Sequence, residues 1–157
     1  MGTSLTAGNN GWPAVMLGDW LNKAFPGQVM LFNEAVGGSA SSVGPHNKPA
    51  LSGLSKLPAV LARKPDVVFI EFATNDAFLA YNISPEDSGK TLTTLIDRIL
   101  EANAHTEIIL QTMNSVQGVH AERRPKLDTY TQGYRDVAKA RGLLLVDHYP
   151  NWQRIMK

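Results

Sequence analysis

Four short apolar runs that alternate with helical patterns constrain the fold of this chain more than any other feature. The runs span residues 28–33, 67–72, 107–112 and 143–147. Short, continuous apolar runs are typical of strands that are covered on both faces. Strands that alternate with helices are joined by right-handed crossovers, which make neighbouring strands parallel. The sequence therefore predicts an α/β fold, with a mostly parallel sheet between two layers of helices.

The segments between these runs carry apolar residues at helical spacing. In residues 12–25 the apolar side chains recur at intervals of three or four positions, and Pro13 lies in the first turn, where proline is tolerated. A second helix is expected after Ser84, with that serine as its N-cap and Pro85 as its first residue. Two further helices are expected over residues 51–61 and 125–140.

The loops that follow the strands are expected to gather at one edge of the sheet. In open parallel sheets, the functional crevice lies outside the carboxyl ends of the strands. The loops around Gly37, Asn75, Val116 and His148 fall on this edge, and Ser4 joins them if a strand precedes it. We therefore expect these segments to form one site.

Composition argues against several other classes of protein. The chain has 157 residues, of which 43% are hydrophobic, and this suits a single domain over residues 1–157 with a sizeable core. Its formal net charge is +1 and its charges are dispersed, which favours neither a nucleic-acid partner nor an anionic membrane surface. The longest apolar run, residues 67–72, is too short to span a bilayer.

The sequence also offers little to hold a cofactor. It contains no cysteine, and its four histidines are scattered without acidic residues to bracket them, so we expect no metal site. Residues 8–11 include two glycines but lack the lysine and the spacing of a phosphate loop, so no nucleotide cofactor is expected. The lack of cysteine leaves the compartment open, because exported proteins can also lack it.

Ser4 is the candidate nucleophile. It lies in a turn between Gly2 and Gly8, just before the helix that begins near Trp12. A serine hydroxyl is a weak nucleophile near neutral pH and needs a base, a group that orients the base, and donors for the oxyanion. A tight turn that leads toward a helix can present both a hydroxyl and a free backbone N–H. The alternative is a cap loop rich in glycine, serine and threonine that carries no chemistry.

Two further segments, residues 33–39 (NEAVGGS) and residues 73–76 (ATND), each directly follow an expected strand. Read in order with residues 2–5 (GTSL), they resemble the sequence blocks of the SGNH, or GDSL-type, hydrolase family. The resemblance implies a flavodoxin-like three-layer α/β/α fold in which Ser4 is the nucleophile and Gly38 and Asn75 donate to the oxyanion.

Each of these residues also has a structural alternative. Gly38 could serve only a turn that requires a positive φ, and Asn75 with Asp76 could form an Asx turn that caps the short segment after the strand. We expect Asp76 to be structural and to bond nearby backbone.

The sequence departs from the family pattern at several positions. Thr3 stands where the family usually has aspartate, and Ala35 and Ala73 stand where glycine is common. The late D-x-x-H motif, which supplies the family's acid and base, occurs nowhere in the chain. The resemblance also implies a strand before the serine turn, where only Met1 precedes Gly2. We therefore expect a domain without its first strand and its C-terminal D-x-x-H segment.

The general base is left open by the sequence. His105 precedes a strand and so belongs to the opposite edge of the sheet, while His46 and His120 lie in loops on the expected edge without an acidic residue at the family's spacing. His148 follows Asp147 directly, and neighbours at the end of a strand point to opposite faces, which disfavours an acid–base pair between them. The resemblance places the true pair beyond the end of this sequence.

The resemblance implies a serine esterase that acts, without a cofactor, on a small acyl ester such as an acetyl or short-chain ester. The competing function is a catalytically silent member of the same fold that binds carbohydrate or a protein partner, and the missing base and Thr3 motivate it. A flavodoxin-like nucleotide or receiver domain is disfavoured because the sequence has neither a phosphate loop nor an acidic cluster.

Overall fold

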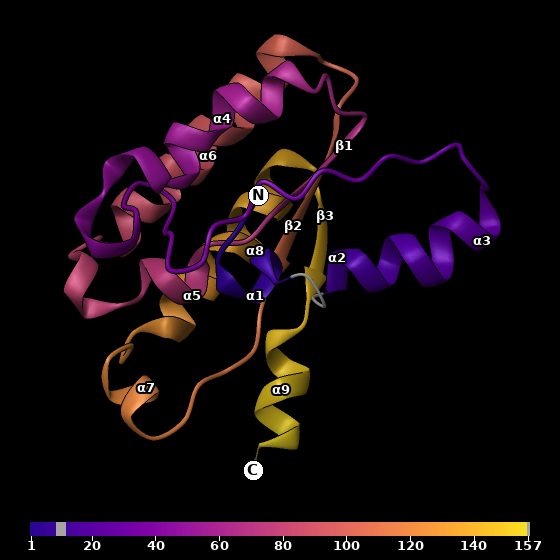
Figure 1. Cartoon of the computed structure of the whole chain (residues 1–157). Coiled ribbons are helices and arrows are strands. Elements are labelled where there is room, and N and C mark those ends of the chain that lie inside the picture. Colours follow the sequence, from indigo (N-terminus) through magenta and orange to yellow (C-terminus); the bar gives the residue numbers. More distant parts are fainter. Residues whose placement is uncertain (9–11, 157) are drawn as a thin grey trace.

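The computed structural model describes residues 1–8 and 12–156 (Figure 1). Residues 9–11, part of the stretch that we expect not to bind a nucleotide, lie outside the described residues, as does Lys157. In the described part of the chain, β1 (Val67–Ile70), β2 (Glu107–Thr112) and β3 (Leu144–Asp147) form one sheet in the order β1-β2-β3. Both strand pairs are parallel. This confirms the parallel α/β architecture.

Three long helices cover one face of the sheet. α4 (Gly53–Ala62) packs against α6 (Pro85–Ala102), α6 packs against α8 (Leu127–Arg141), and α8 contacts β2. Alternate strand residues such as Ile70 and Leu110 are fully buried in the same core as Leu95 of α6. The two-residue period of the strands thus directs one set of side chains into this helical layer.

The opposite face of the sheet is less completely covered. Phe69 and Ile109, which alternate with the buried residues, are half buried. The ring of Trp12 contacts the ring of Phe69 edge to face, with 5.1 Å between their centroids. Trp12 begins the helical segment expected over residues 12–25, which leads away from the sheet in Figure 1. This segment consists of α2 (Trp12–Val15), a π-helical stretch (Met16–Leu21) and α3 (Asn22–Ala24).

The prediction of a strand over residues 28–33 is wrong. The segment is extended but belongs to no sheet, and its side chains Met30 and Phe32 are 81% and 46% exposed. A strand needs a hydrogen-bonded neighbour. Met1 and Gly2 lie beside β1, but Gly2 accepts from the N–H of Val36, which lies after this run, at 3.1 Å. Within the run, the Asn33 side chain donates to the Thr6 carbonyl oxygen at 2.7 Å, and the backbone has no ladder partner among the described residues.

Short helices occupy several of the loops. The serine turn is α1 (Ser4–Ala7), and the loop expected between β2 and α8 contains α7 (Val119–Glu122), which follows Gly118 in a positive-φ conformation. The remaining short elements are α5 (Ala73–Asp76), α9 (Tyr149–Ile155) and the 3-10 turns Pro45–Asn47, Pro49–Leu51 and Leu79–Tyr81. Ser84 caps α6 as expected, because its hydroxyl accepts from the Asp87 N–H at 3.0 Å.

Candidate active site

Hydrogen bonds connect the three segments that carry Ser4, Gly38 and Asn75. The carbonyl oxygen of Gly2 accepts from the Ser39 hydroxyl at 3.0 Å, and the Asn75 side-chain amide donates to the Ser39 carbonyl oxygen at 2.8 Å. A Cβ placed on Gly37 would lie 3.8 Å from the Cβ of Ser4, so this glycine lies directly against the serine. The fold therefore brings the candidate residues into neighbouring positions, although they are far apart in the sequence.

Ser4 lies at the start of α1 with its side chain exposed. Thr3 is the N-cap, and its hydroxyl oxygen accepts from the Leu5 N–H at 3.3 Å. Among the residues that the structure describes, the N–H of Ser4 donates to no acceptor. This is expected of a first-turn amide, which has no partner inside its own helix. The turn is thus both a capped helix start and a place where a hydroxyl and an amide are open to a ligand.

Gly38 has the left-handed backbone conformation that a glycine adopts without strain, with φ of 76°. A Cβ at this position would lie 3.1 Å from the Cβ of Pro45, and the Tyr81 hydroxyl donates to the Gly38 carbonyl oxygen. The turn therefore requires glycine for its own geometry, as the structural alternative held. The same conformation leaves the approach to the peptide unit free of a side chain.

Asn75 is almost buried, with 9% of its surface exposed, and lies in α5 at the carboxyl end of β1. Its amide nitrogen carries two hydrogens, and the bond to the Ser39 carbonyl oxygen uses one of them. This bond fixes the orientation of the side chain and leaves the second N–H for another acceptor. Because the amide reaches across to another segment, the Asx-turn alternative does not describe it.

Asp76 is structural, as expected. Its carboxylate is buried and accepts from the Ser41 N–H at 2.7 Å and from the Ser88 hydroxyl at 2.5 Å. Burial raises the pKa of this carboxyl, and the two donors work in the opposite direction. Asp76 thereby ties the loop that follows Gly38 to α5 and to the first turns of α6.

Glu71 is a residue of the site that we did not predict from the sequence. Its carboxylate is 1% exposed and accepts from the Thr3 N–H at 2.6 Å and from the Thr6 hydroxyl at 2.7 Å. Burial raises its pKa to about 7, against the lowering effect of the hydrogen bonds from Thr3 and Thr6. The available signal was a lone acidic residue inside the apolar run 67–72.

The structure assigns no histidine to Ser4. His46, His105, His120 and His148 are all exposed, and none of their side chains bonds to a described residue. His105 lies before β2, at the edge opposite the site, as expected. The base of a serine hydrolase is therefore not identified in the described part of the chain.

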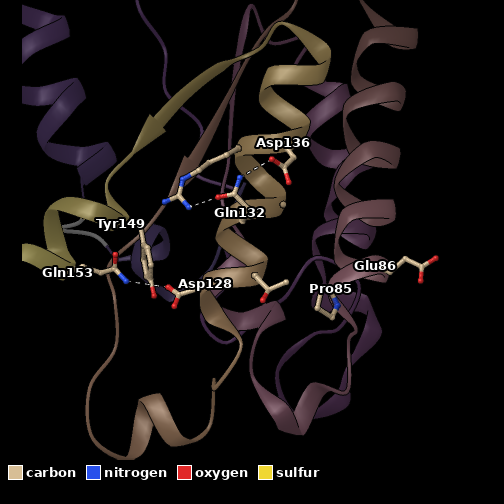
Figure 2. A pocket seen from close by; sticks show the side chains of 10 residues that line it. Pro85, Glu86, Asp128, Gln132, Asp136, Tyr149 and Gln153 are labelled. Atoms are coloured by element: carbon tan, nitrogen blue, oxygen red, sulfur yellow. Dashed lines mark hydrogen bonds between the residues drawn. The ribbon is translucent and has the colours of Figure 1, made fainter.

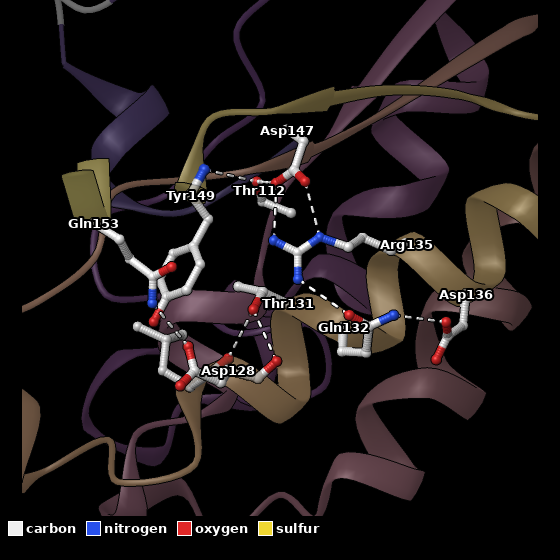
Figure 3. Close-up of polar contacts among 10 residues, drawn as sticks. Thr112, Asp128, Thr131, Gln132, Arg135, Asp136, Asp147, Tyr149 and Gln153 are labelled. Atoms are coloured by element: carbon white, nitrogen blue, oxygen red, sulfur yellow. Dashed lines mark hydrogen bonds and ion pairs between the residues drawn. The ribbon is translucent and has the colours of Figure 1, made fainter. Parts of the chain in front are cut away.

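The carboxylate of Asp147 is bonded to Arg135 and Thr112 and not to the side chain of His148 (Figure 3). It accepts from Arg135 Nε at 2.8 Å and from the Thr112 hydroxyl at 2.5 Å. Although burial alone would raise the pKa of Asp147, the hydrogen bonds from Arg135 and Thr112 lower it. The Thr112 hydroxyl in turn accepts from the Tyr149 N–H at 3.1 Å. This network joins β2, β3, α8 and the start of α9, which is a structural role.

A further cavity lies away from these residues (Figure 2). It has a volume of about 760 Å³ and is an open depression on the surface of α8, between Pro85 and Tyr149. Its lining includes none of Ser4, Gly38 and Asn75.

No cluster of metal-ligating side chains occurs among residues 1–8 and 12–156, and no helix in that part is both long and apolar enough to cross a membrane.

Comparison with known proteins identifies the family to which these segments are similar. Residues 1–155 match the GDSL-like lipase/acylhydrolase family. None of the curated proteins matches the chain in sequence.

Several solved structures have the same fold. The lipase/acylhydrolase from Enterococcus faecalis is 26% identical and superposes with a TM-score of 0.74 over 96% of this chain and 74% of its own. A carbohydrate acetylesterase family member from Sinorhizobium meliloti is 19% identical, with a TM-score of 0.75 over 94% of this chain and 80% of its own. The aryl esterase of M. smegmatis is 18% identical, with a TM-score of 0.74 over 94% and 81%. The last two similarities concern the fold alone.

Proposed function

We propose, since this chain belongs to the GDSL-like lipase/acylhydrolase family, that it is a serine ester hydrolase in which Ser4 attacks the carbonyl carbon of a small acyl ester. Membership of the family supports the hydrolysis of acyl esters in general. The restriction to acetyl or other short acyl groups is our proposal. It is compatible with the presence of a carbohydrate acetylesterase family member and an aryl esterase among the proteins of the same fold.

One observation carries the assignment of residues: Ser39 is bonded both to the segment of Ser4, through the carbonyl oxygen of Gly2, and to the side chain of Asn75. In the proposed reaction, attack by the Ser4 hydroxyl places a negative charge on the former carbonyl oxygen of the ester. The Ser4 N–H, the Gly38 N–H and the second N–H of the Asn75 amide are the donors for that charge. Each such donor is worth about 2.7–4 kcal/mol in the transition state.

The proposed reaction then releases the alcohol and leaves an acyl group on Ser4, which water removes in a second step. Both steps need a group that takes the proton from the attacking hydroxyl and returns one to the leaving oxygen. The family pattern assigns this role to its D-x-x-H motif, which the chain does not contain. The proposal therefore rests on the nucleophile and the oxyanion donors.

The second candidate function is a binding module of the same fold without catalysis, with a carbohydrate or a protein as its partner. The observation that favours it is the exposed Ser4 hydroxyl, to which no histidine is bonded among the described residues. A binding module would keep the glycine-lined surface beside Gly37 and Gly38 and would have no need of a reactive serine.

A fluorophosphonate probe distinguishes the two functions, because it forms a covalent bond only with an activated serine. We expect labelling of the parent chain that disappears in Ser4→Ala and persists in Ser55→Ala, which removes another exposed serine, near the start of α4. Equal labelling of the parent and Ser4→Ala, or no labelling in a folded parent, would favour the binding module.

A further inference from the structure

Glu71 is a buried carboxylate that the proposed reaction does not use. It follows β1 directly and pairs with Gly2 in an isolated parallel bridge, so it lies beneath the serine turn. A carboxylate with 1% of its surface exposed is rare in a protein interior unless specific donors hold it. The groups that donate to this carboxylate therefore indicate its role.

The donors come from both sides of Ser4. Thr3 is the residue before the serine. Oε1 of Glu71 accepts from the Thr3 N–H at 2.6 Å and from the Thr3 hydroxyl at 3.0 Å. The same oxygen accepts from the Thr6 hydroxyl at 2.7 Å, two residues after it. Hydrogen bonds to a charged acceptor are shorter and stronger than those between neutral groups. One carboxylate thus holds both ends of the short segment in which Ser4 is exposed.

The neighbouring glycine makes room for this carboxylate. A Cβ placed on Gly2 would lie 2.3 Å from Oε1 of Glu71 and 2.8 Å from its Cδ, which is far inside contact distance. Gly2 is therefore required by the position of Glu71 and not by its own backbone angles, since it is absent from the positive-φ glycines. The hydrogen bonds and the space left for the carboxylate are independent observations, and both indicate a site built around it.

A further contact extends the arrangement toward the first helix. The Thr6 hydroxyl, which donates to Glu71, accepts from the indole N–H of Trp12 at 3.3 Å. Trp12 packs on Phe69 of β1. The turn is consequently linked to the sheet through Glu71 and to α2 through Thr6.

We propose that Glu71 is the positioning residue of the serine turn, whose carboxylate holds Thr3 and Thr6 so that the hydroxyl and N–H of Ser4 face the substrate in a fixed geometry. This inference rests on the proposed function for its catalytic consequence, whereas the holding of the turn stands on the contacts alone. Glu71 touches no reacting atom and acts only through Thr3 and Thr6. Small displacements of a nucleophile are costly, about 10²-fold in rate for a shift of about 1 Å.

The test compares four variants with the parent chain. Glu71→Gln removes the charge at nearly constant shape, and Thr6→Val removes one donor hydroxyl while Thr6→Ser retains it. Thr3 is not used, because its hydroxyl also caps α1. Thr106→Val is the matched control: Thr106 is also buried, and its hydroxyl donates to the Pro65 carbonyl oxygen at 2.9 Å, but it lies at the opposite edge of the sheet, before β2.

The first measurement is amide hydrogen exchange over residues 3–7 at a pH above 7, where the Glu71 carboxyl, whose pKa burial raises to about 7, carries its charge. This measurement needs no enzymatic activity. We expect faster exchange in Glu71→Gln and Thr6→Val, and exchange at the parent's rate in Thr6→Ser and Thr106→Val. Unchanged exchange in Glu71→Gln and Thr6→Val would overturn the proposal. If Glu71→Gln does not fold, the contrast between Thr6→Val and Thr6→Ser decides the question.

The second measurement is the rate of fluorophosphonate labelling at Ser4, with kcat and KM on a small aryl acetate. We expect labelling and kcat to fall by about 10²-fold in Glu71→Gln with KM nearly unchanged, and to stay at the parent's values in Thr106→Val. A labelled parent with an equally reactive Glu71→Gln would overturn the positioning role and leave the proposed function standing. A parent that is not labelled would overturn the proposed function, and hydrogen exchange alone would then decide whether Glu71 holds the turn.

Discussion

The side-chain amide of Asn75 donates a 2.8 Å hydrogen bond to the carbonyl oxygen of Ser39, the residue directly after Gly38. This bond joins the loop at the carboxyl end of β1 to the loop that lies against Ser4. It also fixes which N–H of the amide is left for a ligand. The orientation of the proposed oxyanion donor is therefore set by the fold before any substrate binds.

Replacing Asn75 by alanine is expected to lower kcat by about 10²–10³-fold and to leave KM nearly unchanged, because an oxyanion donor acts mainly in the transition state. Steady-state kinetics on a small aryl acetate measures both constants. Asn103→Ala is the control, since this half-buried side chain also bonds backbone, accepting from the His105 N–H at 3.0 Å, but lies before β2 at the opposite edge of the sheet. A kcat equal to that of the parent would remove Asn75 from the oxyanion hole.

Replacing Gly38 by alanine is expected to lower the free energy of unfolding by about 1–2 kcal/mol, because an L-residue is strained in the left-handed region. The close approach of Pro45 adds to this cost. Gly89→Ala is the matched control: Gly89 lies in α6 and a Cβ there would meet nothing within 4 Å, so that variant should gain about 0.5–1 kcal/mol. Urea denaturation of both variants measures the difference, and equal effects would contradict it.

The stability of the parent relative to Glu71→Gln is expected to fall as the pH rises from about 4.5 to about 7. Burial raises the pKa of Glu71 from 4.5 to about 7, so over this range the folded chain retains a proton that the unfolded chain has lost. The contribution of this proton is complete below pH 4.5 and is lost as the pH passes 7. Denaturation of both proteins at several pH values measures it. A difference that rises with pH would show that the pKa is lowered by folding.

Replacing His148 by alanine is expected to change neither the stability nor the labelling of Ser4 noticeably, since surface substitutions usually act within about 0.5 kcal/mol. Its side chain is exposed, and the carboxylate of Asp147 is held by Arg135 and Thr112. A general base contributes about 10²–10⁴-fold to the rate. A loss of that size in ester hydrolysis by His148→Ala, with folding intact, would make His148 the base.

Much of the fold could be predicted from local patterns. The apolar runs at 67–72, 107–112 and 143–147 became β1, β2 and β3, and the capping signal at Ser84 marked the start of α6. These features depend on the spacing of apolar residues along the sequence and on helix capping, both of which involve only a few neighbouring residues. The parallel order placed the loop with Asn75 at the carboxyl edge, whereas the loop with Gly38 reaches this edge through the hydrogen bonds of Ser39 to Gly2 and Asn75.

Whether residues 28–33 join the sheet depends on the tertiary structure alone. The run has the composition of a strand, but strand formation needs a second chain segment for its hydrogen bonds, and no sequence pattern supplies one. Val36, which lies after this run, bonds Gly2, whereas the run itself pairs with no strand, and its apolar side chains Met30 and Phe32 stay exposed.

The sequence by itself determined the parallel α/β architecture, the family, and the set of candidate residues Ser4, Gly38 and Asn75, because these follow from local patterns and from short motifs in a fixed order. Only the tertiary structure decided that Glu71 lies under the serine turn, since its bonds to Thr3 and Thr6 span 68 and 65 positions. The tertiary structure also decided that the carboxylate of Asp147 accepts hydrogen bonds from Arg135 and Thr112. Contacts over such separations arise from the packing of whole elements, and the identity of one residue does not specify its distant partner.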